Sequence, residues 1–167
     1  LPIHIVWLEL LIHPTALLVF QDPPPPGRMA PADRGRASFF GRRGWAAIML
    51  TGLAVTVAML LVYRGGMVAG DATHARTVAM ATLVLASVTI TAVLSALASR
   101  TARVVALGSL ASLVLLVQVP ALADWVHLRP LGQRDWALAL ATGIGTGSLA
   151  LFFTARSPAR PAPTKRR

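Results

Sequence analysis

Residues 77–99 contain no charged side chain and consist of apolar, small and hydroxyl-bearing residues. At a rise of 1.5 Å per residue, a helix of this length crosses the roughly 30 Å hydrocarbon core of a bilayer. A chain of 167 residues is too small to enclose several such helices in a soluble core. The stretch therefore predicts that this chain lies in a membrane.

Further apolar stretches of similar length recur along the chain. Hydrophobic residues make up 55% of the sequence and charged residues 13%, as expected for several membrane spans. We expect an all-α fold, a polytopic membrane bundle within residues 1–155. Its five predicted transmembrane helices are 3–20, 44–63, 77–99, 104–123 and 136–154.

Two segments outside these spans have a different composition. Residues 21–43 are rich in proline and arginine, and the run Pro23–Pro26 cannot be helical, because proline lacks an amide donor and restricts the residue before it. We expect an extended cytosolic loop there. Residues 156–167 combine proline with basic residues and predict a disordered cytosolic tail that contacts lipid headgroups.

The basic residues predict how the chain crosses the membrane. Of the 16 Lys and Arg residues, twelve lie in 28–43, 100–103 and 156–167, and four lie in the loops that alternate with these segments. The positive-inside rule places the richer side in the cytoplasm, so we expect the N-terminus outside and the C-terminus in the cytoplasm. The membrane we expect is the plasma (inner) membrane. A net charge of +10 in short clusters between apolar runs also argues against nucleic acid as a partner.

The sequence contains no cysteine, which excludes disulfides and a thiolate nucleophile within this chain. No metal centre and no catalytic residue are predicted. The chain opens directly on an apolar segment without an initiating methionine, so we expect it to be the processed or truncated end of a longer protein.

The first span carries ionisable groups within its apolar length. Glu9 lies near its middle and His13 one turn later on the same face. Pro14 breaks the helix and leaves the carbonyl of Leu10 without its usual amide donor. A carboxylate beside an open carbonyl suits a cation, so these residues form a candidate cation pathway. The alternatives are a protonated Glu9 packed in the bundle and an inert interhelical hydrogen bond from His13.

Small and hydroxyl-bearing residues predict where helices approach one another. The structural interpretation, packing alone, is favoured over an ion path for each of them. The candidate packing residues are Ser87, Thr91, Ser95 and Ser99 on one face of 77–99, Gly143 and Gly147 in 136–154, and Gly52 with Thr56 in 44–63.

Four motifs in order resemble one family. These are "LPIHIVWLELLIHPTALLVFQDPP", the loop "GRMAPADRGRASFFGRRGW", "ARTVAMATLVLAS", and "VPALADWVHLRPLGQRDWALAL". Together they resemble the carboxy-terminal transmembrane region of P-type cation-transporting ATPases. The resemblance implies that the five spans are the sixth to tenth helices of a pump, with the remaining N-terminal part of the pump and the transported cation as partners.

This sequence departs from the family pattern at positions that bear on which cation is transported. Calcium and sodium pumps usually carry asparagine, threonine and aspartate in the sixth helix, where this chain has Glu9, Ile12 and His13. At the eighth-helix position where the family often carries a glutamate or glutamine ligand, this chain has Ser87 or its neighbour Ala86, so the resemblance implies Ser87 as part of the cation pathway. Fewer oxygen ligands argue against a many-oxygen calcium cage, and a carboxylate with an imidazole would also suit proton countertransport.

The chain has no "DKTGT"-like segment, so the aspartate that such pumps phosphorylate is absent. ATP and Mg²⁺ would bind cytosolic domains outside this chain, which is not expected to hydrolyse ATP alone. Two alternatives stay open. One is a self-standing five-span accessory protein, and the other is a small proton-coupled transporter using Glu9 and His13.

Overall fold

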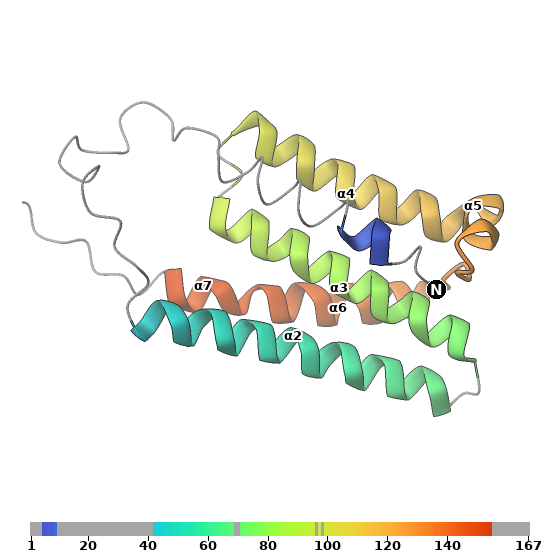
Figure 1. The fold of residues 1–167 in the computed structure, drawn as a ribbon, viewed down its shortest axis with the longest axis horizontal. Coiled ribbons are helices and arrows are strands. Elements are labelled where there is room, and N and C mark those ends of the chain that lie inside the picture. The colour runs from blue at the N-terminus through green and yellow to red at the C-terminus, as the bar shows by residue number, and fades with distance from the viewer. Residues whose placement is uncertain (1–4, 10–41, 69–70, 96, 98, 155–167) are drawn as a thin grey trace, which may run out of the picture.

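The computed structural model describes residues 5–9, 42–68, 71–95, 97 and 99–154 (Figure 1). The described part of the chain is helical and contains no β-strand. Residues 5–9 form a short helical segment, and six further helices follow: α2 (Arg42–Val68), α3 (Ala72–Ser95), α4 (Arg100–Gln118), α5 (Pro120–Trp125), α6 (Gln133–Gly147) and α7 (Leu149–Thr154).

The long helices run antiparallel to their neighbours in sequence (Figure 1). Helices α2 and α4 finish at one end of the bundle, and α3 and α6 begin there. Helix α5 lies at the same end, in the segment that connects α4 to α6. We call this end the His74 end, after a residue in the first turn of α3. The opposite end holds the start of α2, the turn between α3 and α4, and the end of α7.

Helix α3 lies at the centre of the bundle and packs against α2, α4, α6 and α7. Among the described helices, α4 packs against α3 and α5, and it does not pack against α2 or α6. The small residues on α3 let its neighbours approach closely, because an alanine side chain adds little width to a helix. Ala75, Ala81 and Ala86 of α3 are completely buried.

Three described helices are long and apolar enough to cross a membrane: Trp45–Val68, Ala72–Ser95 and Arg100–Gln118. Many large apolar side chains on these helices face outward. Leu61 on α2 and Leu107 on α4 are each 66% exposed, an arrangement that suits lipid or further helices rather than water. Residues 10–41 and 155–167 lie outside the described residues, and with them most of the span expected at 3–20 and the tail expected at 156–167. Of the loop expected at 21–43, only Arg42 and Arg43 are described, and they begin α2.

The helix bounds differ from the expected spans at several ends. The span expected at 44–63 extends to Val68, so that Gly65 and Gly66 lie within α2 and not in the following turn. The span expected at 77–99 begins at Ala72 and ends at Ser95. The side-chain hydroxyl of Ser95 donates to the carbonyl of Thr91 and accepts the N–H of Leu97, and the positive φ of Leu97 (49°) turns the chain out of the helix.

The span expected at 104–123 is divided. Helix α4 ends at Gln118, and Pro120 starts the short helix α5. Val119 between them is extended, at φ −86° and ψ 111°, because the residue before a proline is disfavoured in the α region. The expected single span thus ends earlier, and α5 changes direction at the His74 end (Figure 1).

The last expected span, 136–154, corresponds to α6 and α7 in succession. Ser148 between them keeps helical angles, φ −69° and ψ −15°, and its N–H donates to the carbonyl of Ile144 (2.9 Å). The N–H of Leu151 then bonds the Ser148 carbonyl at the tighter i to i−3 spacing (2.9 Å). The two helices therefore follow one another with a local tightening, and α7 continues the course of α6 in Figure 1.

Candidate functional site

The residues expected to form a cation pathway are placed only in part. Glu9 ends the described helical segment 5–9 and its side chain is exposed in the structure. Leu10, His13 and Pro14 lie outside the described residues. Trp7 and Leu8 of the same segment pack against the hydrophobic core that α3, α4 and the α5–α6 connection share. The described segment of the first expected span therefore lies against the hydrophobic core of the bundle.

Ser87 is half-buried on α3 and shares a helix face with Met80 and Thr91, which lie seven residues before it and four residues after it. Met80 packs against the same hydrophobic core that Trp7 and Leu8 contact. The helix face that carries Ser87 and the N-terminal segment thus both adjoin the same hydrophobic core.

The hydroxyls of α3 fall into two groups. Those of Thr82, Thr89 and Ser95 donate to a backbone carbonyl one turn earlier in the helix, at 2.9, 2.7 and 2.7 Å. Within the described residues, the hydroxyls of Ser87 and Thr91 form no hydrogen bond. The Thr77 hydroxyl also donates one turn back, to the carbonyl of Thr73 at 2.9 Å. The oxygens of Ser87 and Thr91, together with the Thr73 hydroxyl in the first turn, are therefore the α3 hydroxyls that form no hydrogen bond within the described residues.

Ser99, which was expected on the same face, does not belong to α3. It is the N-cap of α4, with φ −95° and ψ 157°, and its hydroxyl accepts the N–H of Ala102 at 3.0 Å. Serine is favoured at this position because its oxygen satisfies one of the free amide groups of the first helical turn. The four-residue spacing from Ser95 to Ser99 therefore coincides with a helix boundary.

Gly143 and Gly147 lie at the contact between α6 and α3. A Cβ at Gly143 would stand 2.7 Å from the Cβ of Leu85, and one at Gly147 would stand 2.7 Å from the Cβ of Thr89. Beside them the hydroxyls of Thr82 and Thr142 approach to 3.5 Å across the two helices. Close backbone approach and a polar contact thus occur together at this interface.

Gly52 has a different environment from the other two expected glycines. A Cβ at Gly52 would meet no atom within 4 Å, and its carbonyl accepts the Thr56 hydroxyl at 2.9 Å. Gly66, which the sequence analysis did not single out, is the close-contact glycine of α2, because a Cβ there would lie 2.7 Å from the Cα of Ala75.

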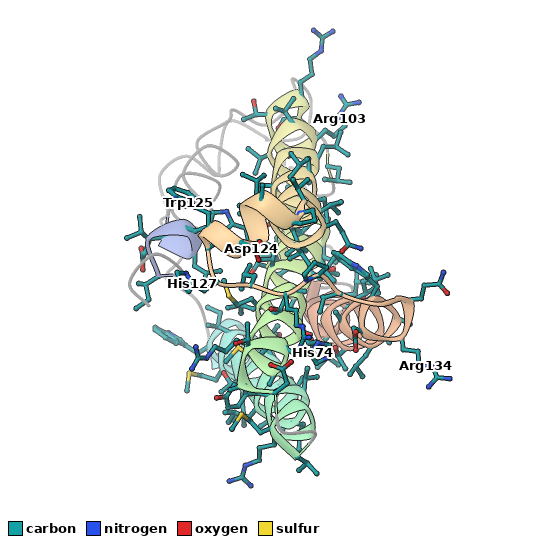
Figure 2. The ribbon with its side chains drawn as sticks, turned by 90° about the vertical axis from the view of Figure 1, so that its right-hand side faces the viewer. His74, Arg103, Asp124, Trp125, His127 and Arg134 are labelled. Carbon is teal, nitrogen blue, oxygen red and sulfur yellow. The ribbon has the colours of Figure 1, made fainter. Side chains whose placement is uncertain are left out.

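A polar cluster at the His74 end was also missed by the sequence analysis. Figure 2 labels one of its members, His74, and shows Arg134 of α6 extending away from the helices at the same end. Arg129, in the connection between α5 and α6, pairs with Asp71 at the start of α3, and its backbone N–H donates to the Thr77 hydroxyl at 3.1 Å. His74 Nε2 lies 3.2 Å from Asp135 Oδ1 on α6. The sequence did contain an indication of this cluster. The loops around Asp71 and Arg129 carry opposite charges, and both are predicted to lie on the outer side of the membrane.

These contacts hold the α5–α6 connection against α3. Asp71 accepts the backbone N–H of His74 (2.9 Å), and this bond, with further help from the Arg129 guanidinium, lowers the pKa of Asp71 below its ordinary value. At the other side of the connection, the Gln118 side-chain amide donates to the carbonyl of Leu131 at 3.3 Å. The connection is therefore fixed from both α3 and α4.

The chemistry open to the described residues is limited. Three or more His, Cys, Asp or Glu side chains do not gather into a possible metal site anywhere in the described part of the chain. The polar contacts at the His74 end are ion pairs, helix caps and hydrogen bonds to the α5–α6 connection, and all of them position backbone. The Ser87 and Thr91 hydroxyls lie elsewhere, in the second half of α3.

The apolar helices, their outward-facing large side chains and the close glycine contacts define an integral membrane protein built as a helical bundle. Residues 1–155 match the family model for "Cation transporting ATPase, C-terminus", and the chain belongs to this family. It is thus the C-terminal membrane part of a P-type cation-transporting ATPase, with membrane lipid and the rest of the pump as its context. Searches of curated proteins and of solved structures gave no match.

Proposed function

We propose that this chain supports the transport half of the pump and contributes side chains to its cation pathway. The observation that carries the proposal is the half-buried face of α3 on which the Ser87 and Thr91 hydroxyls form no hydrogen bond within the described residues. A polar oxygen left available inside a membrane bundle costs free energy unless another group uses it. A passing cation or its hydration water is such a group.

Glu9, His13 and the Leu10 carbonyl are the proposed partners of Ser87 in this pathway, with Pro14 breaking the first span. The packing of Trp7 and Leu8 on the shared core supports this arrangement, because it brings the segment that ends at Glu9 against the bundle that carries Ser87. A carboxylate is the one group of this set that can offset the charge of a cation in the low-dielectric interior.

The proposed topology has five spans, with the N-terminus outside and the C-terminus in the cytoplasm. The three long apolar helices and the near-continuous course of α6 and α7 support four of these spans, and 3–20 is the fifth. ATP and Mg²⁺ would act on cytosolic domains of the pump that this sequence does not contain. The function proposed for the chain is therefore structural support and ion coordination, without ATP hydrolysis of its own.

The test compares two half-buried serines on adjacent helices. The chain is expressed with the remaining part of the pump, and ATP-driven cation uptake into inverted vesicles is measured. S87A removes the available hydroxyl, and we expect the apparent cation affinity to fall by about 3- to 10-fold. S112A is the matched control, because the Ser112 hydroxyl already donates to the Ser109 carbonyl at 3.0 Å on α4.

E9Q is the second arm of the same experiment. It keeps the shape of the side chain and removes its charge, so we expect a large loss of transport. D124N, a change to an exposed carboxyl on α5, is the control and should leave transport unchanged. Normal cation affinity in both S87A and E9Q would reject the proposed pathway.

A further inference from the structure

The four tryptophans of this chain differ in how they are covered. Trp7 and Trp136 pack against the hydrophobic core of the bundle. Trp45, in the first turn of α2, and Trp125, the last residue of α5, are 59% and 69% exposed. Helix α2 begins at one end of the bundle and α5 lies at the other (Figure 1), so the two exposed tryptophans belong to opposite ends.

The separation of these two ends matches the thickness of a bilayer. The apolar part of α2, Trp45–Val68, has 24 residues and is therefore about 36 Å long. The hydrocarbon core of a bilayer is about 30 Å thick, with a headgroup layer on each side. Tryptophan is enriched in these two layers, because its ring is apolar and its N–H needs a polar partner. Trp45 and Trp125 thus lie where the two headgroup layers are expected.

Helix α5 has three sides of different character. On the side that faces the bundle, Ala123 and the following Val126 are buried. Leu122 and Trp125 are exposed, and because they are three residues apart they share one face of α5. Asp124, which is two residues from Leu122 and so lies on the opposite side of the helix, is also exposed. The exposed surface of α5 is therefore apolar on one side and acidic on the other.

The position of α5 in the chain agrees with this division. Helix α4 is an apolar span of 19 residues, about 28 Å long, that ends at Gln118. Pro120 then starts α5 in a new direction, so α5 does not continue across the bilayer. Figure 2 shows Trp125 on the side of α5 that points away from α6. A short helix that follows the end of a span and exposes one apolar side has the features of a segment in the membrane interface.

The residues after α5 limit how deep this helix can lie. His127 is exposed directly after α5, and Arg129 is exposed while it pairs with Asp71. A charged pair in hydrocarbon would cost several kcal/mol, so this level of the bundle is in contact with headgroups or water. The Trp125 ring therefore lies at the boundary of the hydrocarbon and not within it.

We propose that α5 lies in the headgroup layer at the His74 end and anchors the bundle there. Leu122 and Trp125 insert between the headgroups and the first part of the acyl chains, and Asp124 faces water. Trp45 is the counterpart of Trp125 in the opposite headgroup layer. The partner of this surface is the lipid bilayer, and the two tryptophans fix how deep the bundle sits in it. The inference does not depend on the cation pathway or on which end of the bundle lies outside the cell.

The test measures how brominated phosphatidylcholine quenches tryptophan fluorescence in vesicles that contain the full chain. The bromine is placed either near the headgroup end of the acyl chain or near its methyl end. A reporter with W7F, W45F and W136F keeps Trp125 alone. We expect shallow bromine to quench it at least about twofold more strongly than deep bromine. A second reporter, with W7F, W125F and W136F, keeps Trp45 and should show the same preference.

Trp136 provides the matched control, because it lies at the same end of the bundle as Trp125 but packs against the core. In a reporter with W7F, W45F and W125F, shallow bromine should quench it less than about half as strongly as it quenches Trp125. Equal quenching of the two tryptophans would overturn the proposal, since it would remove the difference between a lipid-facing ring and a packed one.

Other outcomes separate the lipid interface from other covers of α5. Equal or stronger quenching of Trp125 or Trp45 by deep bromine would overturn the proposal, and so would the absence of quenching by both lipids. If a reporter chain does not fold, the difference between the parent and W125F gives the Trp125 signal with the other tryptophans intact.

The measurement is then repeated after assembly with the remaining part of the pump, where W125F in the same assembly supplies the signal to be subtracted. The shallow quenching of Trp125 must persist. Its loss on assembly would assign this surface to the upstream helices of the pump and would also overturn the proposal.

Discussion

Gly143 of α6 faces Leu85 of α3 so closely that a Cβ added to the glycine would lie 2.7 Å from the leucine Cβ. The same added atom would lie 2.9 Å from the carbonyl oxygen of Thr82. One of these neighbours is backbone, so the contact cannot be relieved by rotation of a side chain alone. The separation of the two helices is thereby set by the absence of a side chain at this position.

G143A should therefore destabilise the bundle by about 1–3 kcal/mol, because α6 must move away from α3 to admit one methyl group. G145A is the matched control, since a Cβ at Gly145 would meet nothing within 4 Å. That change should leave stability unchanged or raise it by up to about 1 kcal/mol, as alanine favours a helix. Denaturant unfolding in detergent micelles measures both variants. Equal stability of G143A and G145A would show that the helices do not meet at Gly143.

His127 is expected to carry backbone strain that glycine would relieve. Helix α5 ends in a Schellman motif, in which the N–H of Leu128 bonds the carbonyl of Ala123 (2.7 Å) and the N–H of His127 bonds that of Asp124 (3.1 Å). His127 occupies the left-handed position at φ 54°. H127G should raise stability by up to about 1 kcal/mol and H127V should lower it by about 1–3 kcal/mol. A ranking in which the valine variant is the most stable, measured by thermal unfolding, would contradict this assignment.

The Asp71 contacts predict a loss of stability in acid. The pKa of Asp71 is lower in the folded chain than the value of about 3.9 expected when it is unfolded. The stabilisation from this carboxylate is therefore complete above about pH 4, and it is lost as the pH falls through the folded pKa. D71N keeps the helix cap, since asparagine also caps helices. It removes the ionisable carboxylate and with it the part of the stability that depends on pH in acid.

Thermal unfolding of the parent and of D71N between pH 2.5 and 6 measures the difference. The two curves should converge at the acid end, where Asp71 is protonated in both states of the parent. R129Q should give a weaker form of the same effect, because the backbone bond from His74 remains. Parallel curves across the whole range would show that the Asp71 carboxylate contributes no acid-sensitive stability.

The membrane orientation can be tested with single cysteines, because the chain contains none. Cysteines at Ala69 and Gly132, next to the end of α2 and the start of α6, should react with a membrane-impermeant thiol reagent in intact cells. Cysteines at Ser38 and Ala162 should be protected until the cells are opened. Labelling of Ser38 from outside would reverse the orientation that the distribution of basic residues predicts.

The sequence by itself determined the class of the protein and much of its local structure. A long run without charge that lies in a bilayer must form a helix, because only a helix satisfies all of its backbone hydrogen bonds within the segment. The segment's own residues are therefore enough to predict the helix. The motifs that resemble P-type pumps led to the family that the chain belongs to. Local chemistry also contained the signals for two boundaries that the expected spans missed, because Pro120 and the capping Ser99 act on their immediate neighbours.

Only the tertiary structure decided which of these local features meet. Gly52, Gly66, Gly143 and Gly145 are equally small, yet Gly66 and Gly143 lie against another helix, because the rotation of each helix about its axis depends on all of its neighbours. Asp71 and Arg129, like His74 and Asp135, become partners because antiparallel helices bring distant connections to the same end of the bundle. Helical periodicity describes one segment at a time, so it could not specify these pairs. They follow from how the segments pack together.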